Sequence, residues 1–176
     1  FRASPNGATA KDGYRSLLWL EEQVRQRLPE SRAPLFAPVE LPLYAGLEFI
    51  EFAAASAQAG ELGQTLAQLG FAEEGSHRSK RVSLWRNGGA RVVVNAQPHS
   101  WADHFHQRHG VSLCAMALRV SQSAAIVERA RAYGYATWQG DAGPNESPIP
   151  AVGAPDGSLI YLIEVGDDIY TRDFHL

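Results

Sequence analysis

Three histidines stand close together in the chain, at positions 104, 106 and 109, and imidazole nitrogen is a ligand for zinc. On a helix His104 and His106 would lie about 200° apart around the axis, so these two cannot share a ligand face. His106 and His109 could share a face, but the neighbouring sequence offers no third ligand. The spacing therefore favours surface or capping roles over a zinc site.

The remaining reactive groups give no recognisable catalytic motif. Cys114 is the only cysteine, and its place in the apolar run 111–120 predicts a core residue, not a nucleophile or a disulfide. No Gly-x-Ser-x-Gly elbow is present, and the glycines at 88–89 follow Asn87 between two expected strands, unlike a phosphate-binding loop. Three tryptophans are interpreted as core or interface residues: Trp85, Trp101 and Trp138.

The composition is that of a globular protein with one domain and an appendage. Of 176 residues, 45% are hydrophobic and 20% charged, with a net charge of −3 and a pI near 6.1. This balance argues against a nucleic-acid surface or an anionic-membrane surface. No apolar run is long enough to span a membrane, and no signal-peptide pattern is present, so we expect a cytoplasmic protein.

The first 45 residues predict a helix and then an extended linker. Asp12 is suited to cap a helix over residues 14–28, and four prolines between 29 and 43 favour an extended chain. The chain begins with Phe1, not methionine, and stops at Leu176 just after the expected start of another segment. We interpret both ends as cut, so that the chain would be a piece of a larger protein.

From Gly46 onward the order strand, helix and three strands is predicted twice. The first unit has a strand at 47–53, a helix at 56–69 ended by Gly70, and strands at 71–74, 81–86 and 90–95. The second has a strand at 111–120, a helix at 123–133 ended by Gly134, and strands at 135–139, 149–152 and 157–165. Two such βαβββ units predict an α+β fold whose curved mixed sheet encloses a cup.

Five stretches carry a family pattern: Leu47-Glu-Phe-Ile-Glu-Phe-Ala53, Leu69-Gly-Phe71, His109-Gly-Val-Ser-Leu-Cys-Ala-Met-Ala-Leu-Arg-Val120, Val127-Glu-Arg-Ala-Arg-Ala-Tyr-Gly134 and Leu162-Ile-Glu-Val165. Together they resemble the vicinal oxygen chelate superfamily, which includes glyoxalase, bleomycin-resistance proteins and extradiol dioxygenases. More closely, they resemble the N-terminal half of the 4-hydroxyphenylpyruvate dioxygenase domain.

The beginning of the chain carries a second resemblance. Phe1-Arg-Ala-Ser-Pro5 and Asp12-Gly-Tyr-Arg-Ser-Leu-Leu-Trp-Leu-Glu-Glu22 are similar to the last strand-to-helix passage of the TIM barrel in bacterial 3-dehydroshikimate dehydratases, some of which are fused to a dioxygenase-like domain. The resemblance implies four segments: a barrel end (1–28), a proline-rich linker (29–45), a dioxygenase-like first half containing both units (46–166), and the start of a connection to a missing second half (167–176).

The resemblance also implies where a metal would bind. Metal-binding members place His, Gln or Glu on inward faces of equivalent strands, a donor set suited to Fe(II), Mn(II) or Ni(II). Two of these positions fall on Phe49 and Ala115, so only Glu164 matches a superfamily ligand. A shift by two residues would add Glu51, which still gives at most two carboxylates. We expect no catalytic, cofactor-binding or metal-binding residue here, and interpret both glutamates as solvated or as partners of an arginine such as Arg119.

The implied function belongs to a parent protein, a metal-dependent lyase that converts 3-dehydroshikimate to protocatechuate in quinate/shikimate degradation with Mg, Mn, Co or Fe. The chain would be its non-catalytic dioxygenase-like half, without a cofactor of its own. Its expected partners are the missing second half, the dehydratase barrel and further copies of itself. The alternatives are a 4-hydroxyphenylpyruvate dioxygenase-type Fe(II) oxygenase, a free-standing glyoxalase/bleomycin-resistance-like binding protein, and a glyoxalase-class metalloenzyme with ligands shared across a dimer, against which Phe49 and Ala115 argue.

Overall fold

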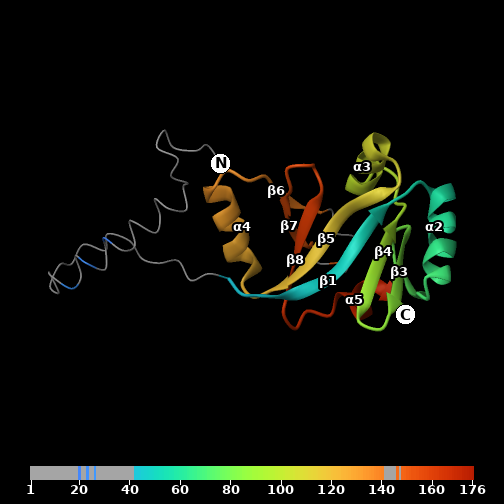
Figure 1. Cartoon of the computed structure of the whole chain (residues 1–176), viewed down its shortest axis with the longest axis horizontal. Helices are drawn as coiled ribbons and strands as arrows, with labels where there is room; N and C mark the ends of the chain where they lie inside the picture. Colours follow the sequence, from blue (N-terminus) through green and yellow to red (C-terminus); the bar gives the residue numbers. More distant parts are fainter. Residues whose placement is uncertain (1–19, 21–22, 24–25, 27–41, 141–145, 147) are drawn as a thin grey trace. The chain divides into compact units, whose positions relative to one another are not determined.

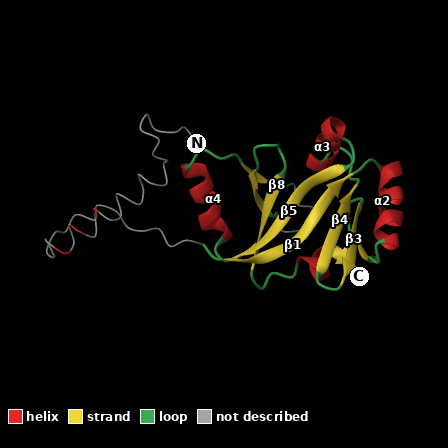
Figure 2. Cartoon of the chain, viewed as in Figure 1, coloured by secondary structure: helices red, strands yellow, loops and turns green. Residues whose placement is uncertain are grey.

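The computed structural model describes residues 42–140, 146 and 148–176, together with Leu20, Gln23 and Gln26. These three are helical, but the rest of the predicted barrel end (1–28) and most of the predicted linker (29–45) lie outside the described residues. Residues Pro42–Leu176 form a compact unit of their own, an α+β fold built on one large sheet (Figures 1 and 2). No helix in the described part is both long and apolar enough to cross a membrane.

The sheet contains two sets of four strands and one short added strand. The first set is β1 (Tyr44–Ala53), β2 (Ala72–His77), β3 (Val82–Asn87) and β4 (Ala90–Asn95). The second set is β5 (Ser112–Val120), β6 (Thr137–Gln139), β7 (Pro150–Gly153) and β8 (Leu159–Glu164), and the added strand is β9 (Phe174–His175). Their order across the sheet is β6-β7-β8-β5-β1-β4-β3-β2-β9.

The pairing of the strands confirms the predicted tandem repeat. β1 runs parallel to β4, the last strand of its own unit, and β5 runs parallel to β8 in the same way. The two first strands, β1 and β5, lie antiparallel at the centre of the sheet, where Ile50 faces Met116. Each unit is therefore joined to the other through its first strand, and the sheet curves around one shared concave face.

One helix of each unit covers the outer face of the sheet. In α2 (Ser56–Gln68), Leu66 packs against Val92 and Val94 of β4. In α4 (Ser123–Ala132), Ile126 packs against Val120 and Leu162. Figure 1 shows α2 and α4 at opposite ends of the sheet, as expected for two copies of one supersecondary unit.

Two glycines explain how α2 is placed. A Cβ atom on Gly63 would lie 2.8 Å from the indole ring of Trp85, so only glycine lets the helix approach β3 this closely. Gly70 follows the helix with φ +88°, a conformation that favours glycine and that turns the chain into β2. Both features follow from residue type, although only the second was predicted from the sequence.

The stretch between the two units forms a helix that the sequence analysis did not assign, α3 (Trp101–His109). Ser100 caps it by accepting a hydrogen bond of 3.2 Å from the backbone nitrogen of Asp103. The Asp103 carboxylate in turn accepts a bond of 2.8 Å from the backbone of His99. A serine followed three positions later by an acidic residue is a sequence pattern that predicts the start of a helix.

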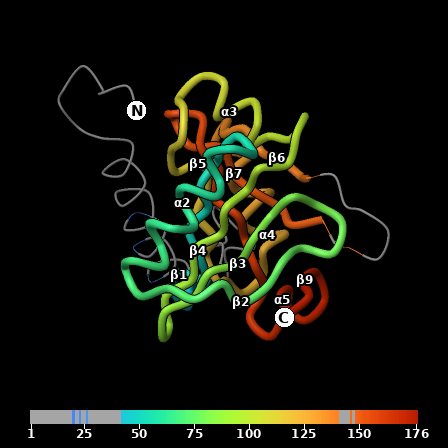
Figure 3. The backbone as a smooth tube through the Cα atoms, turned by 90° about the vertical axis from the view of Figure 1, so that its right-hand side faces the viewer, coloured from blue at the N-terminus to red at the C-terminus, as the bar shows by residue number. Residues whose placement is uncertain are grey.

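The last residues fold back onto the first unit. Asp168 caps a short helix, α5 (Ile169–Asp173), and β9 then pairs with β2 through Ser76–His175 and His77–Phe174. Figure 3 shows α5 and β9 together at the end of the sheet near β2. The segment 167–176, expected to begin a connection to a further half, thus contributes its own strand to this sheet.

Candidate functional site

The concave face of the sheet holds a cavity of about 290 Å³. Its walls come from both units, from α3 and from α5, and they are largely aromatic and aliphatic. The main apolar contributors are Phe49, Val93, Trp101, Trp138, Tyr161 and Ile169. A concave apolar cavity with a few convergent polar groups is the usual form of a small-molecule site.

The carboxyl group of Glu51 is one of three that line this cavity, together with those of Glu146 and Asp173. Alternation along β1 turns Phe49 and Glu51 toward the concave face, whereas Ile50 and Phe52 pack on the outer side near α2. Glu51 is 5% exposed, and its Oε1 accepts a hydrogen bond of 2.7 Å from Nδ2 of Asn95 on β4. Burial raises the pKa of Glu51, while Asn95 chiefly opposes this shift. Burial therefore shifts the equilibrium of Glu51 toward the protonated acid relative to a solvated glutamate.

Two further titratable groups contact this carboxyl, and both are held neutral. Burial raises the pKa of Tyr161 well above its ordinary value, and Glu51 adds to the shift. Burial likewise raises the pKa of Cys114, which is completely buried. Cys114 is thus a core residue as predicted, and its thiol is not activated as a nucleophile.

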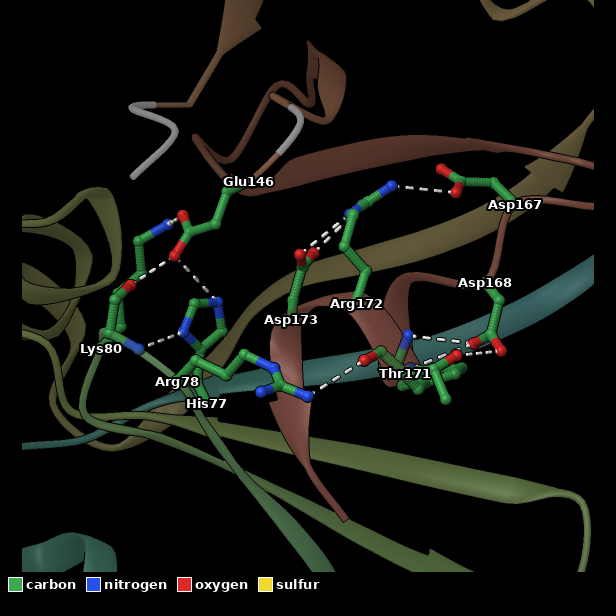
Figure 4. Close-up of polar contacts among 11 residues, drawn as sticks. His77, Arg78, Lys80, Glu146, Asp167, Asp168, Thr171, Arg172 and Asp173 are labelled. Atoms are coloured by element: carbon green, nitrogen blue, oxygen red, sulfur yellow. Dashed lines mark hydrogen bonds and ion pairs between the residues drawn. The ribbon is translucent and has the colours of Figure 1, made fainter. Parts of the chain in front are cut away.

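The polar side of the cavity is formed by His77, Lys80 and Glu146 (Figure 4). Nζ of Lys80 lies 2.6 Å from Oε2 of Glu146, and Nε2 of His77 lies 3.7 Å from Oε1 of the same carboxylate. Burial lowers the pKa of His77, although the charge of Glu146 opposes the shift. Lysine and glutamate form an ion pair here, and the neutral imidazole is favoured beside it.

A second polar cluster holds the C-terminal segment against the cavity (Figure 4). Nε of Arg172 lies 2.9 Å from Asp173, and its Nη1 lies 3.0 Å from Asp167. From the β2 side, Arg78 donates a hydrogen bond of 3.3 Å to the carbonyl of Thr171. These contacts fix α5 and β9, so that the segment serves as one wall of the cavity.

Glu164, the one position that matches a superfamily ligand, is a solvated residue, which is one of the two roles interpreted from the sequence. It is exposed, and its carboxylate accepts hydrogen bonds of 3.1 and 2.6 Å from the backbone nitrogens of Gln122 and Ser123 at the start of α4. These bonds, chiefly those with Ser123, lower its pKa. The preceding residue, Ile163, packs in the concave core instead. Along a strand, adjacent side chains point to opposite faces, so Glu164 caps a helix on the outer side.

Arg119, named as an example of an arginine partner for the two glutamates, pairs with Glu48, and the solvated role is wrong for Glu51, which is buried. Nε of Arg119 lies 2.5 Å from the carboxylate of Glu48, and Arg91 approaches the same carboxylate at 3.5 Å. Glu48 is 7% exposed, and the Arg119 bond, ahead of the opposing burial, lowers its pKa. A register shift between Leu47 and Phe49 interrupts simple alternation in β1, which is why the sequence pattern did not reveal this buried ion pair.

The histidines of α3 serve the packing of that helix. Nδ1 of His104 lies 2.8 Å from the carbonyl of Ser100, and Nε2 of His106 lies 2.7 Å from Oε1 of Gln58 on α2. The ring of His109 lies 4.3 Å from that of Phe105. Their separate contacts agree with the surface and capping roles predicted from the spacing.

The cavity does not fit a divalent metal ion. Phe49 and Ala115 both lie on the concave side but carry no donor atom, and Glu51 is joined there by neutral Asn95 and Tyr161. The two other carboxylates that line the cavity are engaged in ion pairs, Glu146 with Lys80 and Asp173 with Arg172. In the part of the chain that is described, no group of three His, Cys, Asp or Glu residues could hold a metal. Octahedral cations need a richer oxygen or nitrogen donor set.

Comparison with known proteins gives consistent matches. Residues 40–175 match the family model "Hydroxyphenylpyruvate dioxygenase, HPPD, N-terminal". The 3-dehydroshikimate dehydratases of Pseudomonas putida and Pseudomonas aeruginosa are 48% and 50% identical over 100% and 99% of this chain. A solved xylose isomerase-like TIM barrel/4-hydroxyphenylpyruvate dioxygenase fusion protein matches all of it with a TM-score of 0.73 and 49% identity. The chain spans 29% of the length of each of these three proteins.

Proposed function

Since the chain belongs to the family of hydroxyphenylpyruvate dioxygenase N-terminal domains, we propose that it is the non-catalytic first half of a dioxygenase-like domain in a longer 3-dehydroshikimate dehydratase. The parent would be a cytoplasmic, metal-dependent lyase that dehydrates 3-dehydroshikimate to protocatechuate. Its divalent metal and its catalytic residues would lie outside these 176 residues. The role of this half would be to build the sheet onto which the rest of the domain assembles, in a homo-oligomer.

This proposal rests mainly on which residues match the dioxygenase family and which match the dehydratases. The dioxygenase family pattern begins at residue 40, whereas the two dehydratase relatives match all or nearly all of the chain. Residues before the dioxygenase-like part are therefore shared with dehydratases as well. The cavity supports a structural role, because each carboxyl group that lines it is already engaged, by Asn95, Lys80 or Arg172, which does not favour a centre for metal-assisted dehydration.

A chimera tests the proposal directly. The matching segment of the Pseudomonas putida dehydratase is replaced by residues 1–176, and formation of protocatechuate from 3-dehydroshikimate is measured with added Mg²⁺, Mn²⁺ or Co²⁺. We expect the chimera to keep most of the parent activity, because the dehydrating groups lie elsewhere. A folded chimera without activity, or a 176-residue chain that dehydrates the substrate alone, would refute the proposal.

The oxygenase alternative has its own test. The isolated chain is loaded anaerobically with Fe(II), mixed with 4-hydroxyphenylpyruvate and then exposed to oxygen in a Clark cell. Oxygen uptake above the rate of free Fe(II) would establish a 4-hydroxyphenylpyruvate dioxygenase-type activity. We expect none, because the cavity lacks a set of three ligands among the described residues.

A further inference from the structure

We propose that the cavity on the concave face binds one small uncharged aromatic molecule that carries a carbonyl oxygen, and that this oxygen accepts a hydrogen bond from the Glu51 carboxyl. No metal takes part in this binding. The inference stands on the cavity itself and does not depend on the parent protein being a dehydratase.

The size and the walls of the cavity select a single aromatic ring. A volume of about 290 Å³ exceeds the roughly 150 Å³ at which an apolar protein cavity binds benzene. Three aromatic side chains follow one another along the wall, with ring centroids 6.2 Å apart between Trp101 and Trp138 and again between Trp138 and Tyr161. Phe49 continues the series, also 6.2 Å from Tyr161. Such surfaces favour offset or edge-to-face contact with another ring.

The polar groups of the cavity favour a ligand that carries a hydrogen-bond acceptor. The carboxyl of Glu51 accepts a hydrogen bond from the amide of Asn95 and lies beside the phenol of Tyr161, while the thiol of Cys114 donates to the backbone carbonyl of Glu51. In the acid form, the carboxyl of Glu51 carries a proton that a ligand oxygen in the cavity can accept. The indole N–H of Trp101 is buried without a hydrogen-bond partner in the described part of the chain. An oxygen atom on the ligand would give such donors an acceptor, since an unsatisfied buried donor is costly.

The surrounding charges select a neutral ligand. The groups that act on Glu51 are Lys80 from the loop after β2, Cys114 from β5 and Tyr161 from β8. Glu146 pairs with Lys80 at 2.6 Å, and the neutral form of His77 is favoured beside it. The cation is therefore already matched, and a ligand carboxylate would be buried without a counter-charge of its own.

Binding of benzamide to the 176-residue chain tests the proposal, with benzoate and toluene as comparison ligands. Isothermal titration calorimetry gives the affinities, and ¹⁵N–¹H spectra follow the indole signal of Trp101, assigned with Trp101→Phe. We expect benzamide to bind with one site, to shift the Trp101 signal, and to bind more tightly than either comparison ligand. Equal or tighter binding of toluene or benzoate, an unmoved Trp101 signal, or no binding at millimolar benzamide would overturn the proposal.

Substitutions at Glu51 test whether its carboxyl donates the hydrogen bond to the ligand oxygen. Glu51→Leu should weaken benzamide at least about tenfold, whereas Glu51→Gln keeps a donor and should stay within about threefold of the unmodified protein. Glu73→Gln, at an exposed position on β2, is the matched control and should change nothing. If Glu51→Leu does not fold, pH decides instead: affinity should fall as Glu51 ionises in the unmodified protein and stay level in Glu51→Gln. Parallel pH profiles would exclude Glu51 as the donor.

Discussion

The side-chain amide of Asn95 donates a hydrogen bond of 2.7 Å to the carboxyl of Glu51, and this bond joins β4 to β1 beneath the cavity. The two strands run parallel, so the bond links the last strand of the first unit to its first. The bond places on the concave face a hydrogen-bonded acid rather than a set of metal ligands. The chemistry available to this half-domain is therefore hydrogen bonding in an apolar setting.

The first prediction concerns the stability of the protein as pH changes. Because burial raises the folded-state pKa of Glu51 above its ordinary value of 4.5, the folded protein binds more protons than the unfolded one above that pH. Glu51 should therefore reduce stability as pH rises from about 4.5 through the raised pKa, by up to about 1.4 kcal/mol per pH unit.

Urea unfolding of the unmodified protein and of Glu51→Gln between pH 4 and pH 9, roughly the range over which a raised carboxyl pKa is observed, measures this effect. The difference in unfolding free energy should move in favour of Glu51→Gln as pH rises. Glu73→Gln should follow the unmodified protein throughout. A difference that stays constant with pH would show that Glu51 titrates normally.

The second prediction concerns the start of α4. Gln122 at the helix N-cap has φ +60° and provides no side-chain cap, so Glu164 supplies the acceptor from β8. Glu164→Ala should cost about 1 kcal/mol of unfolding free energy and speed amide exchange at Ser123. Since the pKa of Glu164 is lowered, its contribution should be present above 4.5 and be lost as pH falls through the lowered value.

Glu128→Ala is the control for this substitution, because Glu128 is exposed on the same helix and pairs only at the surface with Arg131. It should cost no more than a few tenths of a kcal/mol, about the value of a surface pair. Equal losses in the two variants, or an unchanged exchange rate at Ser123, would show that Glu164 is not the cap.

The third prediction concerns the C-terminal strand. A Cβ atom on Gly75 would lie 2.5 Å from the backbone oxygen of His175, closer than atoms can approach. Gly75→Ala should therefore separate β9 from β2, with faster amide exchange at Ser76 and earlier proteolysis after Phe174. Gly60→Ala is the control, since a Cβ there meets nothing within 4 Å and a helix interior should gain about 0.5–1 kcal/mol. Retained β2–β9 protection in Gly75→Ala would contradict the close packing.

The fourth prediction concerns metal content. The chain is exposed anaerobically to Fe(II) and, separately, to Mn(II) or Co(II), freed of excess metal and analysed by plasma mass spectrometry. Because Glu51 bonds to Asn95 while Glu146 and Asp173 pair with Lys80 and Arg172, we expect far less than one ion per chain. Glu51→Gln and Glu164→Gln identify any site that does form: near one equivalent in the unmodified chain, lost in either variant, would show that the chain carries its own metal centre.

The order of the elements could be predicted because it is encoded locally. The helix that ends before Gly70, the turn at Gly88–Gly89 between β3 and β4, and the apolar run of β5 each depend on residues close in sequence. The predicted limits agree with the structure to within a few residues. Helix α3 could also have been predicted, because Ser100 and Asp103 form a capping pattern that can be recognised from sequence.

What each carboxylate does was decided only by the tertiary structure. The sequence determined that residues 46–165 form two βαβββ units around a cup without a family ligand at Phe49 or Ala115. It could not show that Glu48 pairs with Arg119, that Glu51 is buried or that Glu164 caps a helix. These outcomes depend on strand register, where a shift of one residue exchanges the two faces of the sheet, and on partners brought together from distant parts of the chain.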